Sequence, residues 1–176
     1  MITGNENKFK EAQRLIPKLE RKAVNLTEIQ ENDYIKIASH KLDEAAKHVK
    51  SNIIVDDASI ELECLNGFPG PYAKDFFKKL GLKIPKITEK LGNSKAKMRC
   101  TIGLNHNGEK YFFQGEVEGT IMEPKKETGF DYDVIFCPKG YERPFAELPF
   151  EVKIKESHRT KALQKLVKFL KEKNEL

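Results

Sequence analysis

The sequence predicts an α/β protein with a long, twisted mixed sheet and helices at its sides. Two observations lead to this class. Segments with apolar residues at three- and four-residue spacing, typical of amphipathic helices, alternate with short apolar segments typical of strands. No internal repeat or low-complexity linker interrupts the 176 residues, a length for which one domain is the default. We therefore expect a single domain over residues 1–176.

The first half of the chain predicts helix and strand in turn. A helix is expected over residues 6–19, a short strand over 23–26 and an amphipathic helix over 35–50. The apolar run 53–55 predicts a buried strand that stops at Asp56 and Asp57. In α/β proteins, acids that bind ligands gather at such carboxyl ends of strands.

The second half begins with the turn-rich segment 66–71, which precedes a helix over about 72–80. Strands over 98–106 and 110–118 are expected to form a hairpin, because residues 105–108 between them are a turn sequence. Shorter strands should follow at 119–122 and 134–137, and Ser157 should cap a last helix. The inner face of that helix would be formed by Ala162, Leu163, Leu166, Val167 and Leu170.

The composition indicates a soluble, cytoplasmic protein. No apolar run approaches the 18 or so residues of a membrane span, and we expect no leader peptide before Met1. The cysteines are odd in number, far apart and without metal or redox spacing, which predicts reduced thiols in strands. They are Cys64, Cys100 and Cys137.

The net charge of +5 comes mostly from lysines spread along the chain. A surface rich in lysine and glutamate is typical of heat-adapted proteins, whereas a nucleic-acid binder would carry arginines and aromatic residues in one stripe. No such stripe is present, so we expect no nucleic-acid partner. A basic balance also suits a small polyanion such as a nucleotide.

The segment 3–8 combines a tight polar turn, the start of a helix and a lysine. Backbone N–H groups of the turn, the positive end of the helix dipole and a lysine ammonium together favour phosphate binding. Taken alone, the segment is better interpreted as an ordinary helix start capped by Asn5, and the phosphate interpretation depends on the rest of the chain. Its candidate ligands are Thr3, Asn5 and Lys8.

An acidic set, Glu28, Asp56 and Asp57, follows the predicted strands. Carboxylates of this kind suit Mg²⁺, which takes one or two of them together with substrate phosphates. Because side chains alternate along a strand, only one of the two aspartates should face the site squarely. The residues alone leave open which of the two it is, and an isolated pair of aspartates is more typical of a solvated junction between a strand and a turn.

Two further segments suit recognition of a base. An aromatic residue flanked by acids, at 130–133 with Phe136 beyond, could stack on a base or simply anchor a loop. The run Ser157-His158-Arg159 and Lys153 offers hydrogen-bond donors at a helix start. Ser157 and His158 are adjacent and point apart, so no serine-histidine-acid triad is implied.

In this order the motifs resemble the inosine triphosphate pyrophosphatases, the Ham1-like family of nucleotide hydrolases. The resemblance runs nearly end to end and rests on six separated motifs. They are Thr3-Gly4-Asn5-x-x-Lys8; Asn25-Leu26-x-Glu28-x-Gln30; Val55-Asp56-Asp57 with Leu65-Asn66-Gly67-x-Pro69-Gly70-Pro71-Tyr72; Phe130-x-Tyr132-Asp133; Gly140-Tyr141 with Ala146-Glu147; and Lys153 with Ser157-His158-Arg159.

The resemblance implies an elongated fold of two lobes with a central cleft, a homodimer, and Mg²⁺-dependent hydrolysis of ITP, dITP and XTP to monophosphate and pyrophosphate. In this family pattern Lys8 and Asn5 would hold phosphates, and Glu28 and Asp57 would organise metal and water. We expect Asp57 to be the catalytic base, assisted by Lys8, and Glu28 to be a metal ligand. The base would be surrounded by Phe130, Tyr132, Asp133, Lys153, His158 and Arg159.

Some residues depart from the family pattern. Only two residues precede the phosphate turn, Ala58 stands where serine or threonine is usual, and Asp131 and Tyr132 replace a frequent glycine and tryptophan. Two alternatives remain open at this point: a Maf-type nucleotide pyrophosphatase, and a basic nucleic-acid-binding module. The Ser-His-Arg run argues against the first.

Overall fold

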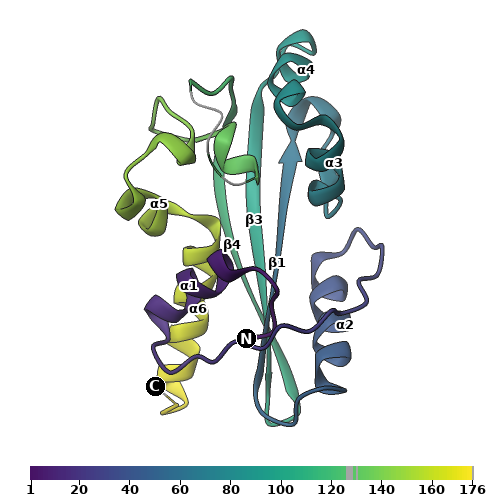
Figure 1. The fold of residues 1–176 in the computed structure, drawn as a ribbon, viewed down its shortest axis with the longest axis vertical. Helices are drawn as coiled ribbons and strands as arrows, with labels where there is room; N and C mark the ends of the chain where they lie inside the picture. The colour runs from purple at the N-terminus through teal and green to yellow at the C-terminus, as the bar shows by residue number, and fades with distance from the viewer. Residues whose placement is uncertain (126–128, 130, 176) are drawn as a thin grey trace. The chain divides into compact units, whose positions relative to one another are not determined.

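The computed structural model of the chain describes residues 1–125, 129 and 131–175. Its sheet has the strand order β2-β1-β3-β4-β5, with β1, β3 and β4 much longer than the two edge strands (Figure 1). The strands are β1 (Ile53–Leu62), β2 (Pro69–Gly70), β3 (Lys95–His106), β4 (Glu109–Ile121) and β5 (Phe136–Pro138). Both edge strands pair antiparallel with their neighbours. The predicted α/β class with flanking helices is confirmed.

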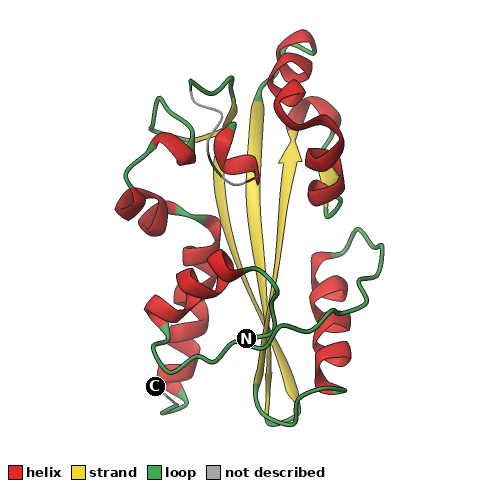
Figure 2. Cartoon of the chain, viewed as in Figure 1, coloured by secondary structure: helices red, strands yellow, loops and turns green. Residues whose placement is uncertain are grey.

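The α-helices flank these strands (Figure 2). They are α1 (Glu6–Leu15), α2 (Tyr34–Ala46), α3 (Ala73–Leu80), α4 (Ile84–Lys90), α5 (Phe150–Glu156) and α6 (His158–Glu172). Short 3₁₀ helices lie at η1 (Glu63–Leu65), η2 (Gly81–Lys83), η3 (Asp131–Val134) and η4 (Phe145–Glu147). Within the described residues, no helix combines the length and the apolar character that crossing a membrane requires.

The chain divides into two compact units, and the division falls within the three long strands. Unit 1 comprises residues 1–57, 100–115 and 158–176, and unit 2 comprises 58–99 and 116–157. Unit 2 contains one apolar cluster and unit 1 contains two. The expectation of a single two-lobed domain over residues 1–176 stays a prediction.

In unit 1, alternation along β1 directs side chains to two different cores. Ile54 packs with residues of α1 and α6, which lie side by side, whereas Ile53 and Val55 pack against α2 (Figure 1). Side chains of a strand point alternately to its two faces. The next two residues therefore diverge as well: Asp56 follows Ile54 toward α1 and α6, and Asp57 follows Val55 toward α2.

In unit 2, one apolar cluster joins the strands to α3, α4 and the 3₁₀ helices. Fully buried members include Ile60, Leu62 and Phe136. Tyr132 belongs to the same cluster, and its hydroxyl donates a hydrogen bond to the carbonyl oxygen of Ala73 at 2.7 Å. Tyr132 thus anchors η3 to the start of α3.

Several predicted boundaries are wrong. The strand at 53–55 does not stop at the aspartates but continues to Leu62, so both acids lie in mid-strand. The expected strand at 23–26 is absent; an isolated bridge pairs Ile2 with Lys22 instead. The separate strand at 119–122 is the end of β4, and the strand at 134–137 is shifted to β5. Helices α4 and α5 were not predicted.

Gly115 allows α6 to lie directly against β4. A Cβ added there would be 2.2 Å from the carbonyl oxygen of His158 and 2.4 Å from the amide nitrogen of Ala162. We expect Gly115→Ala to lower the free energy of unfolding by about 1–3 kcal/mol, because the helix backbone must move away. Chemical denaturation of both proteins measures the change.

Gly4→Ala is the matched control for stability, since an added Cβ at Gly4 meets nothing within 4 Å. It should change the unfolding midpoint little. An unchanged midpoint for Gly115→Ala would contradict the packing described here.

Candidate active site

A buried group of alternating charges surrounds Asp56 in unit 1. The side chain of Asp56 is fully buried; its Oδ1 lies 2.5 Å from Lys8 Nζ, and its Oδ2 lies 2.8 Å from Arg159 Nε. Arg159 Nη1 in turn lies 2.9 Å from Oε2 of Glu11. The thiol of Cys100 also donates to Asp56 Oδ2, at 3.4 Å. Residues from α1, β1, β3 and α6 therefore meet at one carboxylate.

These contacts fix the charge states within the group. Burial alone would raise the pKa of the Asp56 carboxyl, but Arg159 and Lys8 outweigh it and hold that pKa well below its usual range. Burial alone would lower the pKa of Arg159, but Asp56 and Glu11 outweigh it and raise that pKa well above its usual range. Burial raises the pKa of the Cys100 thiol, which keeps it protonated. Asp56 is thus a carboxylate compensated by two cations.

The second acid of the pair has a different partner. Asp57 Oδ1 lies 2.7 Å from Nζ of Lys41 on α2, and Oε1 of Glu28 lies 2.9 Å from the same nitrogen. Burial alone would lower the pKa of Lys41, but Asp57 and then Glu28 outweigh it and raise that pKa above its ordinary value. Two carboxylates of the predicted acidic set therefore converge on one ammonium group.

The donor set of these acids fits a divalent cation only in part. Glu28 and Asp57 approach one another around Lys41, and two carboxylates with substrate phosphates are a common ligand set for Mg²⁺. Asp56 does not fit, because cations already contact both of its oxygens. The described residues contain no cluster of three or more His, Cys, Asp or Glu side chains that could hold a metal by itself.

The predicted phosphate turn lies directly before α1. Thr3 Oγ1 accepts a hydrogen bond from the amide of Asn5 at 3.1 Å. Asn5 is the N-cap, and its Oδ1 accepts from the amides of Asn7 and Lys8 at 2.9 and 3.2 Å. Both side chains therefore shape the turn from within, and Lys8 is the member of the trio that joins the charged group around Asp56.

The residues predicted to recognise the base belong to two different units. In unit 2, Lys153 Nζ lies 2.5 Å from Asp133 Oδ2, which pairs two predicted residues that are distant in sequence. Tyr132 is buried in the core of this unit. In unit 1, His158 and Arg159 are buried at the start of α6. Phe130 lies outside the described residues.

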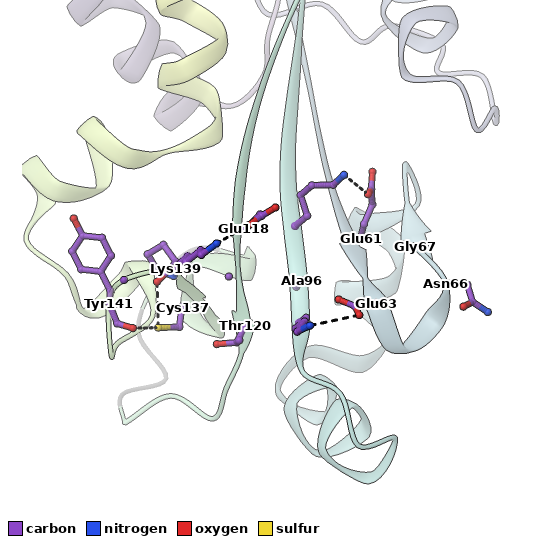
Figure 3. Close-up of a pocket in the computed structure, with 15 residues that line it drawn as sticks. Glu61, Glu63, Asn66, Gly67, Ala96, Glu118, Thr120, Cys137, Lys139 and Tyr141 are labelled. Atoms are coloured by element: carbon purple, nitrogen blue, oxygen red, sulfur yellow. Dashed lines mark hydrogen bonds and ion pairs between the residues drawn. The ribbon is translucent and has the colours of Figure 1, made fainter.

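Unit 2 also contains a pocket of about 840 Å³ (Figure 3). Ion pairs link facing charges along its wall: Lys97 with Glu61 at 3.1 Å, and Lys139 with Glu118 at 3.3 Å. None of the predicted catalytic, substrate-binding or metal-binding residues lines it, although Asn66, Gly67, Gly140 and Tyr141 of two quoted motifs do. Because these charges compensate one another, the pocket does not identify a ligand.

Sequence reasoning missed Lys41 and Glu11. Both are charged residues on the buried side of an amphipathic helix: Lys41 lies between Ala38 and Ala45 on α2, and Glu11 precedes Ala12 on α1. A charge within an apolar stripe requires a buried partner of opposite charge. That signal was present in the sequence.

Unit 1 thus brings cations and carboxylates from distant parts of the chain together at Asp56 and Asp57. The model of the Ham1 family matches residues 1–169, and this chain belongs to that family.

Relatives of known name support the same assignment. An inosine triphosphate pyrophosphatase of Encephalitozoon intestinalis is 38% identical over 175 residues, which cover 96% of this chain and 90% of the relative. A dITP/XTP pyrophosphatase of Methanopyrus kandleri is 38% identical over 176 residues, covering 96% and 94%.

Solved structures give the same result. The Ham1 protein of Staphylococcus aureus matches with a TM-score of 0.81 at 27% identity, covering 98% of this chain and 97% of that one. The HAM1 protein of Coxiella burnetii matches with a TM-score of 0.81 at 28% identity, covering 97% of both chains.

Proposed function

We propose that this protein hydrolyses nucleoside triphosphates with deaminated purine bases, such as ITP, dITP and XTP, to the monophosphate and pyrophosphate. The observation that carries the proposal is the convergence of Asp57 and Glu28 around Lys41, next to the carboxylate that holds Lys8. The names of the relatives, inosine triphosphate and dITP/XTP pyrophosphatase, support the substrate class.

In the proposed reaction, water attacks the α-phosphorus and the bond from this phosphorus to the bridging oxygen breaks. Asp57 accepts the proton of the water, and the leaving pyrophosphate takes the bridging oxygen with its electron pair. Lys41 Nζ lies 2.7 Å from Asp57 Oδ1, and this ion pair orients the carboxylate that accepts the proton. Lys8, on the first turn of α1, offers its ammonium group to the triphosphate.

A magnesium ion bound by Glu28 and Asp57 would supply positive charge against the triphosphate and favour ionisation of the attacking water. Asp56 is left out of this proposed metal site because both of its oxygens have cationic partners. Lys153 and Asp133 are proposed to recognise the base.

The direct test is hydrolysis of a panel of nucleoside triphosphates with detection of pyrophosphate, with and without Mg²⁺. Release of pyrophosphate from ITP and XTP only when Mg²⁺ is present is the expected result. Release of inorganic phosphate alone would rule out attack at the α-phosphorus. We also propose a cytoplasmic homodimer, as the family resemblance implies; the mass in solution, measured by light scattering, tests the dimer.

Lys8→Ala should weaken hydrolysis of ITP and XTP by a similar factor. A charge-assisted contact contributes about 1.5–3 kcal/mol, so kcat/KM should fall by about 10–100-fold. The factors should agree because a phosphate contact carries no information about the base. Steady-state kinetics with both substrates measures them.

Lys10→Ala is the matched control, because Lys10 lies on the same helix in an exposed ion pair with Glu6. It should leave both substrates nearly unaffected. A loss that is confined to one base in Lys8→Ala would show that Lys8 does not act on the phosphates.

A further inference from the structure

Four charged side chains of unit 1 form a chain of alternating sign: Glu11, Arg159, Asp56 and Lys8. Consecutive members are 2.9, 2.8 and 2.5 Å apart. Their side chains are 9, 10, 0 and 22% exposed, so Lys8, at one end, is the most accessible member. The formal charges sum to zero.

The two inner members each divide their interaction between two partners. Asp56 binds Arg159 through Oδ2 and Lys8 through Oδ1, and Arg159 binds Glu11 through Nη1 and Asp56 through Nε. In a buried group, solvent screens such interactions weakly, and a charge change at one member alters the next. The effect of a substitution should therefore alternate in sign along the chain.

Loss of the negative charge at Glu11 leaves Arg159 with Asp56 as its one acidic partner in this group. Arg159 then neutralises Asp56 more completely, and Asp56 holds Lys8 less firmly. Loss of the positive charge at Arg159 has the opposite effect, because Asp56 is left with Lys8. A phosphate ligand competes with Asp56 for the same ammonium group.

We infer that Glu11 and Arg159 are positioning residues that set how firmly Asp56 holds Lys8, and thereby how strongly Lys8 binds a linear polyphosphate. The inference rests on the proposed phosphate role of Lys8. Under this inference Arg159 influences phosphate binding through Asp56 and Lys8, in addition to the base contact expected from the sequence.

The test is calorimetric titration with inorganic tripolyphosphate, without divalent cations and at fixed ionic strength. Tripolyphosphate has no base, so base recognition cannot contribute. We expect Glu11→Gln to bind it about 3–10-fold more tightly than the unmodified protein, and Arg159→Gln to bind it about 3–10-fold more weakly. In a Lys8→Ala background both changes should disappear, because they act through that lysine.

Asp43→Asn is the matched control. Asp43 is also an ion-paired acid of unit 1, 2.6 Å from Lys110, but its side chain is 60% exposed. Its loss should leave tripolyphosphate binding unchanged. Circular dichroism checks that each variant is folded. If Arg159→Gln does not fold, Glu11→Asp replaces it: this variant keeps the charge and should bind like the unmodified protein while Glu11→Gln binds more tightly.

A merely structural role predicts that Glu11→Gln and Arg159→Gln both bind more weakly or unchanged, and this result would overturn the inference. Equal affinities of the unmodified protein and of Lys8→Ala for tripolyphosphate would also overturn the inference. The proposed function is tested separately by hydrolysis of ITP and XTP. If Glu11→Gln binds tripolyphosphate more tightly and Arg159→Gln more weakly, but ITP and XTP are not hydrolysed, the inference holds and the proposed function fails. If ITP and XTP are hydrolysed but the two variants do not differ in this way, the function holds and the inference fails.

Discussion

Replacing Asp57 with asparagine should lower the turnover of ITP by about 10²–10⁴-fold, the usual contribution of a positioned general base. Asparagine keeps the shape of the side chain but cannot accept the proton of the attacking water. Nucleotide binding should largely survive, because Lys8 and the turn before α1 remain. Single-turnover kinetics together with a binding titration separates the two effects.

The neighbouring acid provides the contrast for this experiment. Asp56 faces Lys8 and Arg159, so Asp56→Asn should alter phosphate binding and stability rather than proton transfer. Asp43→Asn, an exposed acid of α2, should leave turnover unchanged. Normal turnover in Asp57→Asn, with none in a folded Asp56→Asn, would show that the two aspartates have been assigned to the wrong roles.

Selectivity for the base should be the other large effect: we expect ITP and XTP to be good substrates and ATP a poor one, by about 10⁴-fold in kcat/KM. Hypoxanthine and xanthine carry a carbonyl oxygen at position 6, where adenine carries an amino donor. The Lys153 ammonium has three N–H donors and no acceptor, and Asp133 accounts for one contact. Adenine would leave a donor facing a donor.

Guanine shares the carbonyl at position 6, so GTP must be rejected at position 2. There hypoxanthine has hydrogen, xanthine an oxygen and guanine an amino group. A backbone N–H donor near the Ser157-His158-Arg159 run would tolerate the hydrogen of hypoxanthine and donate to the oxygen of xanthine. The same donor would face the amino group of guanine, which is also a donor. Arg159 of the same run is expected to contact the base, so we also expect Arg159→Ala to lose 6-carbonyl substrates selectively.

The measurement is kcat/KM for ITP, XTP, GTP and ATP in the unmodified protein and in Lys153→Met. The variant should lose ITP and XTP selectively and approach the low rate of ATP. Lys155→Met, a substitution of another lysine on α5, is the control and should keep the preference. Comparable kcat/KM for ATP and ITP in the unmodified protein would overturn this account of base recognition.

The sequence predicted most helices and the hairpin, because their patterns are local. Asn5 was recognised as a cap and Ser157 as the residue before the last helix from residue type alone. The course of β1 was not predictable in this way. Two adjacent aspartates look like a strand end, since burying them costs free energy unless cations compensate.

The compensating cations come from distant parts of the chain. Arg159 is 103 residues from Asp56, and Lys41 is 16 residues from Asp57. A one-dimensional pattern indicates that a buried charge needs a partner, but it does not say which residue the fold will bring. Family resemblance named Lys8, Glu28 and Asp57, and the structure adds Lys41 and Glu11 as their neighbours.

Unit 1 is built from three separate segments of the chain, and the ribosome synthesises the last of these after all of unit 2. Every residue of unit 2 lies between positions 58 and 157, whereas unit 1 needs residues 158–176 as well. A nascent chain that has reached Ser157 therefore contains all of unit 2, while Asp56 and Glu11 still lack Arg159. The half of the protein that carries Lys153 and Asp133 is available for folding before the half that carries Lys8 and Asp57 can be completed.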